Sequence, residues 1–378
     1  MPDVLIYADT ARSPEMRHEV PIVVPDPFLY VERNGLRHSV SVSFEVDRIN
    51  AIPGGPTAHA YEEFGYDELL DRGLPRHEVN LAVVVNACKE LGVAEATVPA
   101  TFPLAFADRL RAEGVDVTAE SELFAQRRRV KNPTELAGIR RAQRAAEAGM
   151  DAARELLRRA EPNGSVLMLD GEPLTSERIK QAISEVFTAH GMLTDEFIVA
   201  HGPQSAVGHD MGSGPIAPGE AVVIDLWPKD VRTACYADMT RTYVVGDPPA
   251  EIARFHTLCK EALDRSLDAV HAGQAGAAVF RLVCKLFQEA GQPTSLSKQP
   301  GEILEDGFYH GLGHGVGFEV HEQPWLSRTP DELVAGDVIT LEPGLYRQGL
   351  GGVRLEDLVL VTEDGAENLT EYPYALTP

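Results

Sequence analysis

The stretch Gly219–Asp225 reads GEAVVID, and Gly336–Glu342, which begins 117 residues later, reads GDVITLE. In both copies a turn glycine precedes an apolar, strand-like run that ends in a carboxylate. A second acid follows each copy, Asp238 after the first and Glu356 after the second, and these lie 118 residues apart. An ionised carboxylate on an apolar strand is costly unless it is paired or binds a metal ion. The four acids therefore predict a metal site built across an internal two-fold.

A histidine-rich segment between the two copies offers the nitrogen donor. Residues His310–Glu322 read HGLGHGVGFEVHE, with three histidines spaced by four and seven residues. Its glycines allow close backbone approach. Four carboxylates and one imidazole form a mostly hard donor set, which suits a pair of divalent ions such as Mn²⁺, Co²⁺, Fe²⁺ or Zn²⁺. Carboxylates can also bridge two ions about 3.5–4 Å apart that share an activated water.

These segments resemble the pita-bread metallopeptidases, the family of prolidase, aminopeptidase P, methionine aminopeptidase and creatinase. The histidine segment is similar to the prolidase and aminopeptidase P signature. Glu342–Tyr346 (EPGLY) and Val353–Asp357 (VRLED) are similar to the two segments that follow it. The resemblance covers roughly residues 127–370. It implies a dinuclear site in which one metal is chelated by Asp225, both are bridged by Asp238 and Glu356, and the other is bound by His314 and Glu342.

The same resemblance implies the chemistry. A metal-bridging hydroxide would hydrolyse a peptide amide next to proline, as in an Xaa-Pro dipeptidase or aminopeptidase, with two divalent ions and Mn²⁺ favoured. Glu342 would double as proton shuttle, and His209, His310 and His321 would line the substrate pocket, His209 and His321 as catalytic residues. Arg354 is a further candidate for substrate binding. The expected partners are a short peptide or small amide and a second copy of the chain in a homodimer.

Two functions of other classes stay open. A creatinase-like or ectoine-hydrolase-like enzyme would act on a small non-peptide amide. Trp227, where the family usually has a small residue, and Gln204, where asparagine is expected, leave room for it. A non-catalytic binding module is the third reading, which the complete set of five ligands disfavours. Release of proline from Xaa-Pro dipeptides, with and without Mn²⁺, separates the three.

Composition excludes several classes of protein. The chain has 378 residues, 44% of them hydrophobic, and a net charge of −24. This charge argues against nucleic-acid binding, which depends on neutralising phosphates. The basic cluster Arg127–Lys131 is interpreted as a solvated linker or dimer contact. No apolar run approaches the ~18 residues of a membrane span. Four cysteines without zinc or redox spacing, and an N-terminus without a signal-peptide pattern, predict a cytoplasmic protein.

The pattern of elements predicts an α+β protein of two domains. Residues 1–128 are expected to form a smaller α/β domain and residues 129–378 a catalytic domain with an internal pseudo-two-fold. The resemblance implies that the first is creatinase-like and that the second has the pita-bread fold. In the first domain, strands are expected at Val4–Tyr7, Phe28–Val31 and Ser39–Phe44, and helices at Val79–Leu91 and near Leu104–Glu113.

The second domain opens with a capped helix and repeats one order of elements. Asn132 is a cap residue, with proline at the first helical position and glutamate at the third. Two helices, a strand and a hairpin then occur twice. They are expected at Pro133–Ala160, Ser176–His190, Phe197–Ala200 and Ala221–Val245, and again at Ala250–Ala272, Ala275–Ala290, Phe308–His310 and Val338–Val361.

Overall fold

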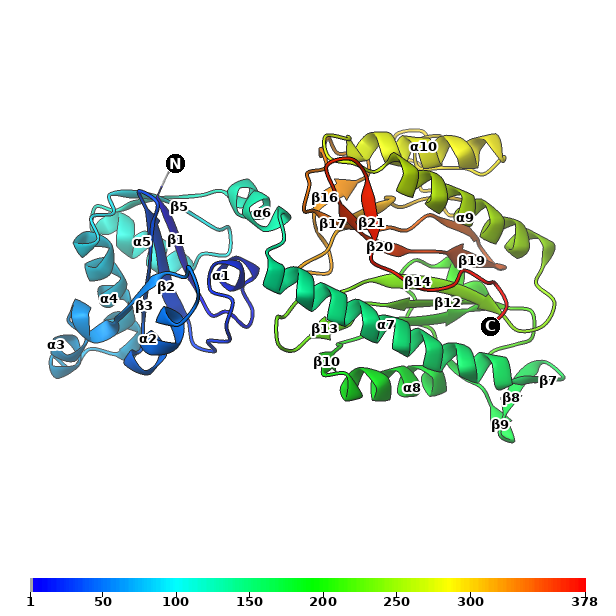
Figure 1. The fold of residues 1–378 in the computed structure, drawn as a ribbon, viewed down its shortest axis with the longest axis horizontal. Helices are drawn as coiled ribbons and strands as arrows, with labels where there is room; N and C mark the ends of the chain where they lie inside the picture. Colours follow the sequence, from blue (N-terminus) through cyan, green and yellow to red (C-terminus); the bar gives the residue numbers. More distant parts are fainter. Residues whose placement is uncertain (1–2) are drawn as a thin grey trace. The chain divides into compact units, whose positions relative to one another are not determined.

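The structure is a computed structural model that describes residues 3–378. The chain divides into two compact units, one ending at Arg128 and the other comprising Arg129–Pro378. Figure 1 shows the helices and strands of each unit. Each unit has its own hydrophobic core. In the described part of the chain, no helix combines the length and the apolar character needed to cross a membrane.

The first unit is built around a six-stranded mixed sheet with the order β4-β3-β2-β1-β5-β6. Successive side chains of a strand point to opposite faces. In β1, Leu5 and Tyr7 enter one core cluster, whereas Val4 and Ile6 enter a second cluster. Both faces of the sheet are therefore covered. The elements are β1 (Val4–Ala8), α1 (Pro14–Glu19), β2 (Phe28–Arg33), β3 (Leu36–Ser41), α2 (Ser43–Asn50), β4 (Thr57–Ala60), η1 (Tyr61–Phe64), α3 (Tyr66–Asp71), α4 (Arg76–Glu90), β5 (Glu95–Val98), α5 (Leu104–Ala112), β6 (Asp116–Ala119) and α6 (Ser121–Arg129).

One strand predicted in the first unit is shorter than expected. The prediction covered Ser39–Phe44, but β3 ends at Ser41 and α2 begins at Ser43. Phe44 is 72% exposed on the first turn of that helix, so the residue that favoured a longer strand faces solvent. The structure confirms the predicted segments that correspond to β1, β2, α4 and α5.

The basic cluster Arg127–Lys131 is not a solvated linker. Within the first unit, Arg127 is ion-paired with Glu19. Within the second unit, Arg129 is ion-paired with Asp337, and both of these side chains are almost completely buried. The interpretation as a solvated linker was wrong, because the acidic partners are remote in sequence and are brought to the cluster only by folding. The other interpretation, a dimer contact, stays a prediction.

The four long helices of the second unit lie in two pairs. Helix α7 (Pro133–Arg159) begins at the predicted cap, where Asn132 accepts hydrogen bonds from the N–H groups of Thr134 and Glu135. The carboxylate of Glu135 accepts the Asn132 N–H in return, which completes a capping box. Helix α7 packs on α8 (Ser176–Ala189), and α9 (Ala250–Ala269) packs on α10 (Gly276–Glu289).

Two antiparallel sheets carry the two acid-bearing strand pairs. One has the order β11-β12-β14 and shares a core with α7 and α8. The other has the order β16-β15-β17-β20-β21, and β17 and β20 share a core with α9 and α10. The strands are β11 (Ile198–His201), β12 (Ala221–Leu226), β14 (Met239–Val244), β15 (Gly313–Gly315), β16 (Glu322–Leu326), β17 (Val338–Leu341), β20 (Asp357–Val361) and β21 (Ala366–Asn368).

Smaller elements connect these layers. A two-stranded ribbon follows β17, a three-stranded sheet follows α7, and a short 3-10 helix follows β11. The ribbon consists of β18 (Gly344–Arg347) and β19 (Gly351–Arg354), the three-stranded sheet of β7 (Glu161–Asn163), β8 (Val166–Leu169) and β9 (Glu172–Pro173), and the 3-10 helix is η2 (Gly202–Ala206). A further two-stranded sheet pairs β10 (Met192–Leu193) with β13 (Lys229–Asp230).

The strand predicted at Phe308–His310 is replaced by β15, which pairs with β17. Phe308 instead packs its ring against Phe280 and Phe287 of α10. Strand β15 escaped prediction because it is rich in glycine, a poor strand former. Glycine is required there, since a Cβ added at Gly313 would lie 2.0 Å from the carbonyl oxygen of Thr340.

Hydrogen bonds join the two strand pairs to each other. The Glu356 N–H donates to the carbonyl of Thr240 at 3.0 Å. The guanidinium of Arg241 donates to the carboxylate of Asp357 at 2.9 Å and to the Glu356 carbonyl at 2.7 Å, with Arg241 and Asp357 fully buried. These bonds hold the start of β20 against β14.

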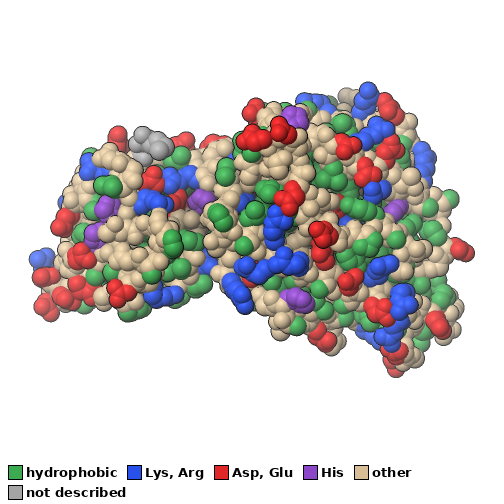
Figure 2. All heavy atoms as spheres, viewed as in Figure 1, with side chains coloured by type: hydrophobic (Ala, Val, Ile, Leu, Met, Phe, Trp, Pro, Cys, Tyr) green, Lys and Arg blue, Asp and Glu red, His purple; other side chains and the backbone are tan. Residues whose placement is uncertain are grey.

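The surface is mixed in charge. On the face shown in Figure 2, acidic and basic side chains are interspersed. Many of the basic side chains are paired with acids, as in the exposed Arg140–Glu367 and Lys89–Glu113 pairs.

Candidate metal centre

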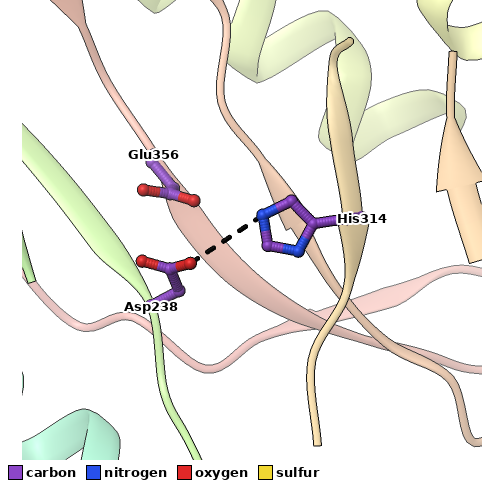
Figure 3. A group of neighbouring side chains, drawn as sticks. All are labelled: Asp238, His314 and Glu356. Carbon is purple, nitrogen blue, oxygen red and sulfur yellow. Dashed lines mark ion pairs between the residues drawn. The ribbon is translucent and has the colours of Figure 1, made fainter. Parts of the chain in front are cut away.

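Three buried side chains meet where the two strand pairs adjoin. Asp238, His314 and Glu356 each present one potential ligand atom, and these atoms lie within 4.8 Å of one another. Figure 3 shows the two carboxylates and the imidazole pointing toward one another from three separate segments of the chain. The imidazole Nε2 of His314 is 3.8 Å from Asp238 and 3.6 Å from the carboxylate of Glu342. Four of the five predicted ligands are therefore neighbours.

The strands position these acids at their ends. In β12, Ile224 and Leu226 pack into the core beneath α7 and α8, so Asp225 between them points to the opposite face. Asp238 directly precedes β14. In the other pair, Glu342 directly follows β17 and Glu356 directly precedes β20.

Asp225, the fifth predicted ligand, is tied to the site through Arg354. The Arg354 Nη2 donates to Asp225 Oδ2 at 2.6 Å, and both side chains are largely buried. The same guanidinium donates to the hydroxyls of Tyr346, at 3.0 Å, and Thr240, at 3.3 Å. Thr240 in turn donates to Glu356 at 2.6 Å. Arg354 was predicted to bind substrate, and its guanidinium contacts Asp225, Tyr346 and Thr240.

The acids repel one another in a buried setting. Burial, followed by the charges of Glu356 and Asp225, raises the pKa of Asp238 well above its usual range. Burial and the charges of Asp225 and Glu342 do the same to the pKa of Glu356. Burial raises the pKa of Glu342 to about 8. Such a set of carboxylates calls for a compensating cation.

Two oxygen atoms and one nitrogen indicate where a cation would bind. The Oδ1 atoms of Asp225 and Asp238 are buried and have no hydrogen-bond partner within the described residues. His314 Nδ1 lies 3.1 Å from the carbonyl of Gly315, which can only accept, so Nδ1 carries the proton and the lone pair of Nε2 is available to a cation bound between the acids. Burial, and then His321, lower the pKa of His314 to about 3, which keeps the ring neutral. The residues fit a divalent metal ion.

Two of the other three predicted histidines lie beside this cluster. His310 contacts the Tyr346 hydroxyl through Nε2 at 2.9 Å, and its Nδ1 is 3.9 Å from Glu342. The ring of His321 lies edge-on to His314, with centroids 4.3 Å apart. His209 is exposed. Burial is the main cause of a lowered pKa at His310, to about 3, and at His321, and the charge of His209 contributes to both. His310 and His321 thus lie beside the cluster, whereas His209 lies exposed on a loop.

Thr240 and Tyr346 were not predicted as site residues. Thr240 contacts both Arg354 and Glu356, and Tyr346 contacts Arg354. Both occur in segments that carried the resemblance or adjoined the acids, but nothing in the local pattern reveals their partners. Of the two unusual residues, Trp227 packs against the core under α7 and α8. Gln204 exchanges two hydrogen bonds with the backbone of Ser213, at 3.0 and 3.1 Å.

Comparisons with known proteins place the chain in context. The model of metallopeptidase family M24 matches residues 137–363. An Xaa-Pro dipeptidase of Pyrococcus furiosus is 38% identical over 176 residues, which cover 46% of this chain and 47% of that enzyme, about half its length. Among solved structures, an Xaa-Pro dipeptidase from Bacillus anthracis superposes with a TM-score of 0.79 at 21% identity, covering 100% of this chain and 94% of that one. An X-Pro aminopeptidase from Thermotoga maritima gives 0.78 at 21% identity, covering 99% and 97%. The fold is that of these enzymes.

Proposed function

The chain belongs to metallopeptidase family M24, and from this premise we propose that it is a metal-dependent Xaa-Pro dipeptidase or aminopeptidase. The observation that carries the proposal is the gathering of Asp238, His314 and Glu356 within 4.8 Å, with Glu342 beside them. The names of the similar proteins, which are Xaa-Pro peptidases, support the choice of substrate.

Two divalent ions are the proposed cofactor. Asp225 would hold one ion, His314 and Glu342 the other, and Asp238 with Glu356 both. Carboxylate oxygens in the majority favour Mn²⁺, with Co²⁺, Zn²⁺ and Fe²⁺ as alternatives. Bound ions of this kind lower the pKa of a coordinated water and polarise a carbonyl group.

The protein's own groups would then move protons and hold charge. Glu342 would accept a proton from the attacking water and pass it to the leaving nitrogen. His209 and His321 would stabilise charge near the tetrahedral carbon. Arg354 would fix the carboxylate of Asp225, as its 2.6 Å hydrogen bond supports.

The proposal extends to architecture and assembly. The first unit would be a creatinase-like domain that restricts the substrates to short peptides or free N-termini. The halves of the second unit, each with a helix pair and an acid-bearing strand pair, would be related by a pseudo-two-fold. The chain would act as a homodimer in the cytoplasm, where its four free, buried cysteines would stay reduced.

A substrate screen tests the proposal. The purified protein is stripped by exhaustive chelation, reloaded with Mn²⁺, and offered Xaa-Pro dipeptides, longer Xaa-Pro peptides, and small guanidino or acetamido acids. Proline release that disappears on chelation and returns with Mn²⁺ is expected. Hydrolysis of the small amides alone would replace the peptidase assignment, and unchanged activity in a metal-free sample would refute the metal site.

A further inference from the structure

His201, at the end of β11, has both ring nitrogens opposite atoms that only accept hydrogen bonds. Its Nδ1 lies 2.7 Å from a carboxylate oxygen of Glu220, and its Nε2 lies 3.1 Å from the carbonyl oxygen of Ser213. The imidazole is 8% exposed. A neutral imidazole has one N–H, whereas an imidazolium has two. Both contacts are therefore hydrogen bonds only when His201 is protonated.

The surroundings of His201 favour the protonated ring. Burial lowers the pKa of His201, but the hydrogen bond and charge of Glu220, with the Ser213 carbonyl, outweigh it and leave the pKa raised. Glu220 is itself fixed, because the Ala217 N–H donates to it at 3.0 Å. Gly202 permits this contact, since a Cβ at that position would lie 2.5 Å from the Glu220 carboxylate.

The contact with Ser213 closes the base of a loop, residues 202–214, which carries His209. The Ser213 carbonyl also accepts a hydrogen bond from Gln204 at 3.0 Å, so that both of its lone pairs are engaged. At its other side the loop contacts the segments that lead to His310 and Arg354, since the Gly352 N–H of β19 donates to the Ser205 hydroxyl at 2.9 Å. The hydroxyl of Tyr309, the neighbour of His310, donates to the Ala206 carbonyl at 2.9 Å.

Other charged groups contact the loop, but they do not contact His201. Glu177 of α8 accepts the Gly214 N–H at 3.0 Å, and Lys180 of α8 donates to the Gly212 carbonyl at 3.1 Å. Asp210 accepts the Gly212 N–H at 2.9 Å. Glu220 is thus the carboxylate that holds the proton of His201, and the loop closure depends on that pair.

We propose that protonated His201 is a positioning residue that fastens the His209-bearing loop beside the metal centre, and that the loop loosens when His201 loses its proton. The proposal rests on the proposed function for the role of His209 in the pocket. The direction of this pH dependence follows from the raised pKa of His201. The clamp is complete below the ordinary histidine pKa of about 6.5, and it is lost as the pH rises through the raised value.

Histidine NMR tests the proton directly and without any assay of activity. The wild type and the variant Glu220→Gln are labelled with ¹⁵N-histidine and titrated. The control variant is His190→Gln, which replaces an exposed histidine at the C-terminal end of α8. His201 should be doubly protonated at pH 6.5, and Glu220→Gln should lower its midpoint by about one unit or more. His190→Gln should leave it unchanged. A neutral His201 at pH 6.5 would overturn the proposal.

Loop closure and catalysis form the second part of the experiment. Hydrogen exchange of residues 202–214 is compared between wild type and His201→Gln at the same pH, so that intrinsic exchange rates cancel. Exchange should be faster in the variant at pH 6.5, and the two should converge at high pH. At pH 6.5 the kcat/KM of the wild type on an Xaa-Pro dipeptide should exceed that of the variant by about tenfold, the effect of one charged hydrogen bond. This ratio should fall toward one at high pH.

The outcomes separate this proposal from the proposed function. Faster exchange in a protein that cleaves no Xaa-Pro peptide would retain the clamp and refute the substrate assignment. Peptide cleavage with a pH-independent ratio and unchanged exchange would refute the clamp alone. If His201→Gln fails to fold, Glu220→Gln carries the same comparison, since it removes the charge that holds the proton.

Discussion

The strand pairs β12–β14 and β17–β20 have the same order of chemistry but give their first acids different partners. Asp225 of the first pair accepts a hydrogen bond from Arg354, which precedes β20 of the other pair, at 2.6 Å. Glu342 of the second pair instead faces two imidazoles, with His314 at 3.6 Å and His310 at 3.9 Å. Asp225 and Glu342 thus occupy equivalent positions in the sequence, but the first lies beside a guanidinium and the second beside two imidazoles.

Asp225 and Glu342, which occupy matching positions in the two strand pairs, therefore suit different roles. A carboxylate bound to a guanidinium is held in one orientation and suits a fixed ligand. A carboxylate that lies beside imidazoles instead suits a proton shuttle. The second acids, Asp238 and Glu356, are alike in being buried with strongly raised pKa values, as expected of residues that share a cation.

The largest expected effect is that of Glu342→Gln. The amide keeps the shape and one coordinating oxygen but cannot accept a proton, so kcat should fall by roughly 10²–10⁴-fold with little change in KM. The assay uses saturating Mn²⁺, and Asp225→Asn serves as the matched change in the other strand pair. That variant should lose activity chiefly through metal affinity and recover in part at high Mn²⁺. Near-normal kcat in Glu342→Gln would leave His209 as the better shuttle.

His321→Ala should reduce kcat by about 10²–10³-fold, the usual cost of losing one donor to a developing oxyanion. Its metal content should stay at the wild-type level, because no ligand has been removed. Elemental analysis after gel filtration, alongside steady-state kinetics, measures both. Loss of metal in this variant would move His321 from the pocket to the ligand set.

Asp238→Asn should abolish tight binding of at least one metal ion. Loss of outer-shell partners alone costs about 10–100-fold in metal affinity, and a bridging ligand should cost at least the upper end of that range. Competitive titration against a chelator of known affinity gives the value. Full occupancy in this variant would contradict the bridging role and the pairing of Asp238 with Glu356.

The smallest expected effect is on thermal stability after chelation. In the metal-free protein Glu342 has a raised pKa, so the folded state binds its proton more tightly than the unfolded state and stability falls as the pH rises from about 4.5 to about 8. Asp238 and Glu356 act in the same direction. Calorimetry should show a Tm several degrees lower without metal at pH 8, and a smaller gap at pH 5. A Tm difference between the metal-loaded and metal-free protein that grows toward low pH would contradict the raised pKa values of these carboxyl groups.

The sequence by itself determined the family and much of the local structure. The capping box at Asn132 fixed the start of α7, because its partners lie within three residues. The family resemblance is confirmed, because the acids and histidines that carried it lie in short, ordered motifs. The roles of the individual ligands stay predictions, although the structure gathers Asp238, His314 and Glu356 within one cluster.

Only the tertiary structure decided which groups face one another. Arg354 and Asp225 are 129 residues apart, and Thr240 and Glu356 are 116 apart, so no local pattern connects them. The glycine-rich strand β15 forms through its pairing with β16 and β17, and glycine is needed at position 313 because the backbone of Thr340 leaves no room for a side chain. His201 looked unremarkable in the sequence, since its proton depends on Glu220 and Ser213. Local propensity acts between neighbours in the chain, whereas burial and charge pairing depend on contacts that folding alone creates.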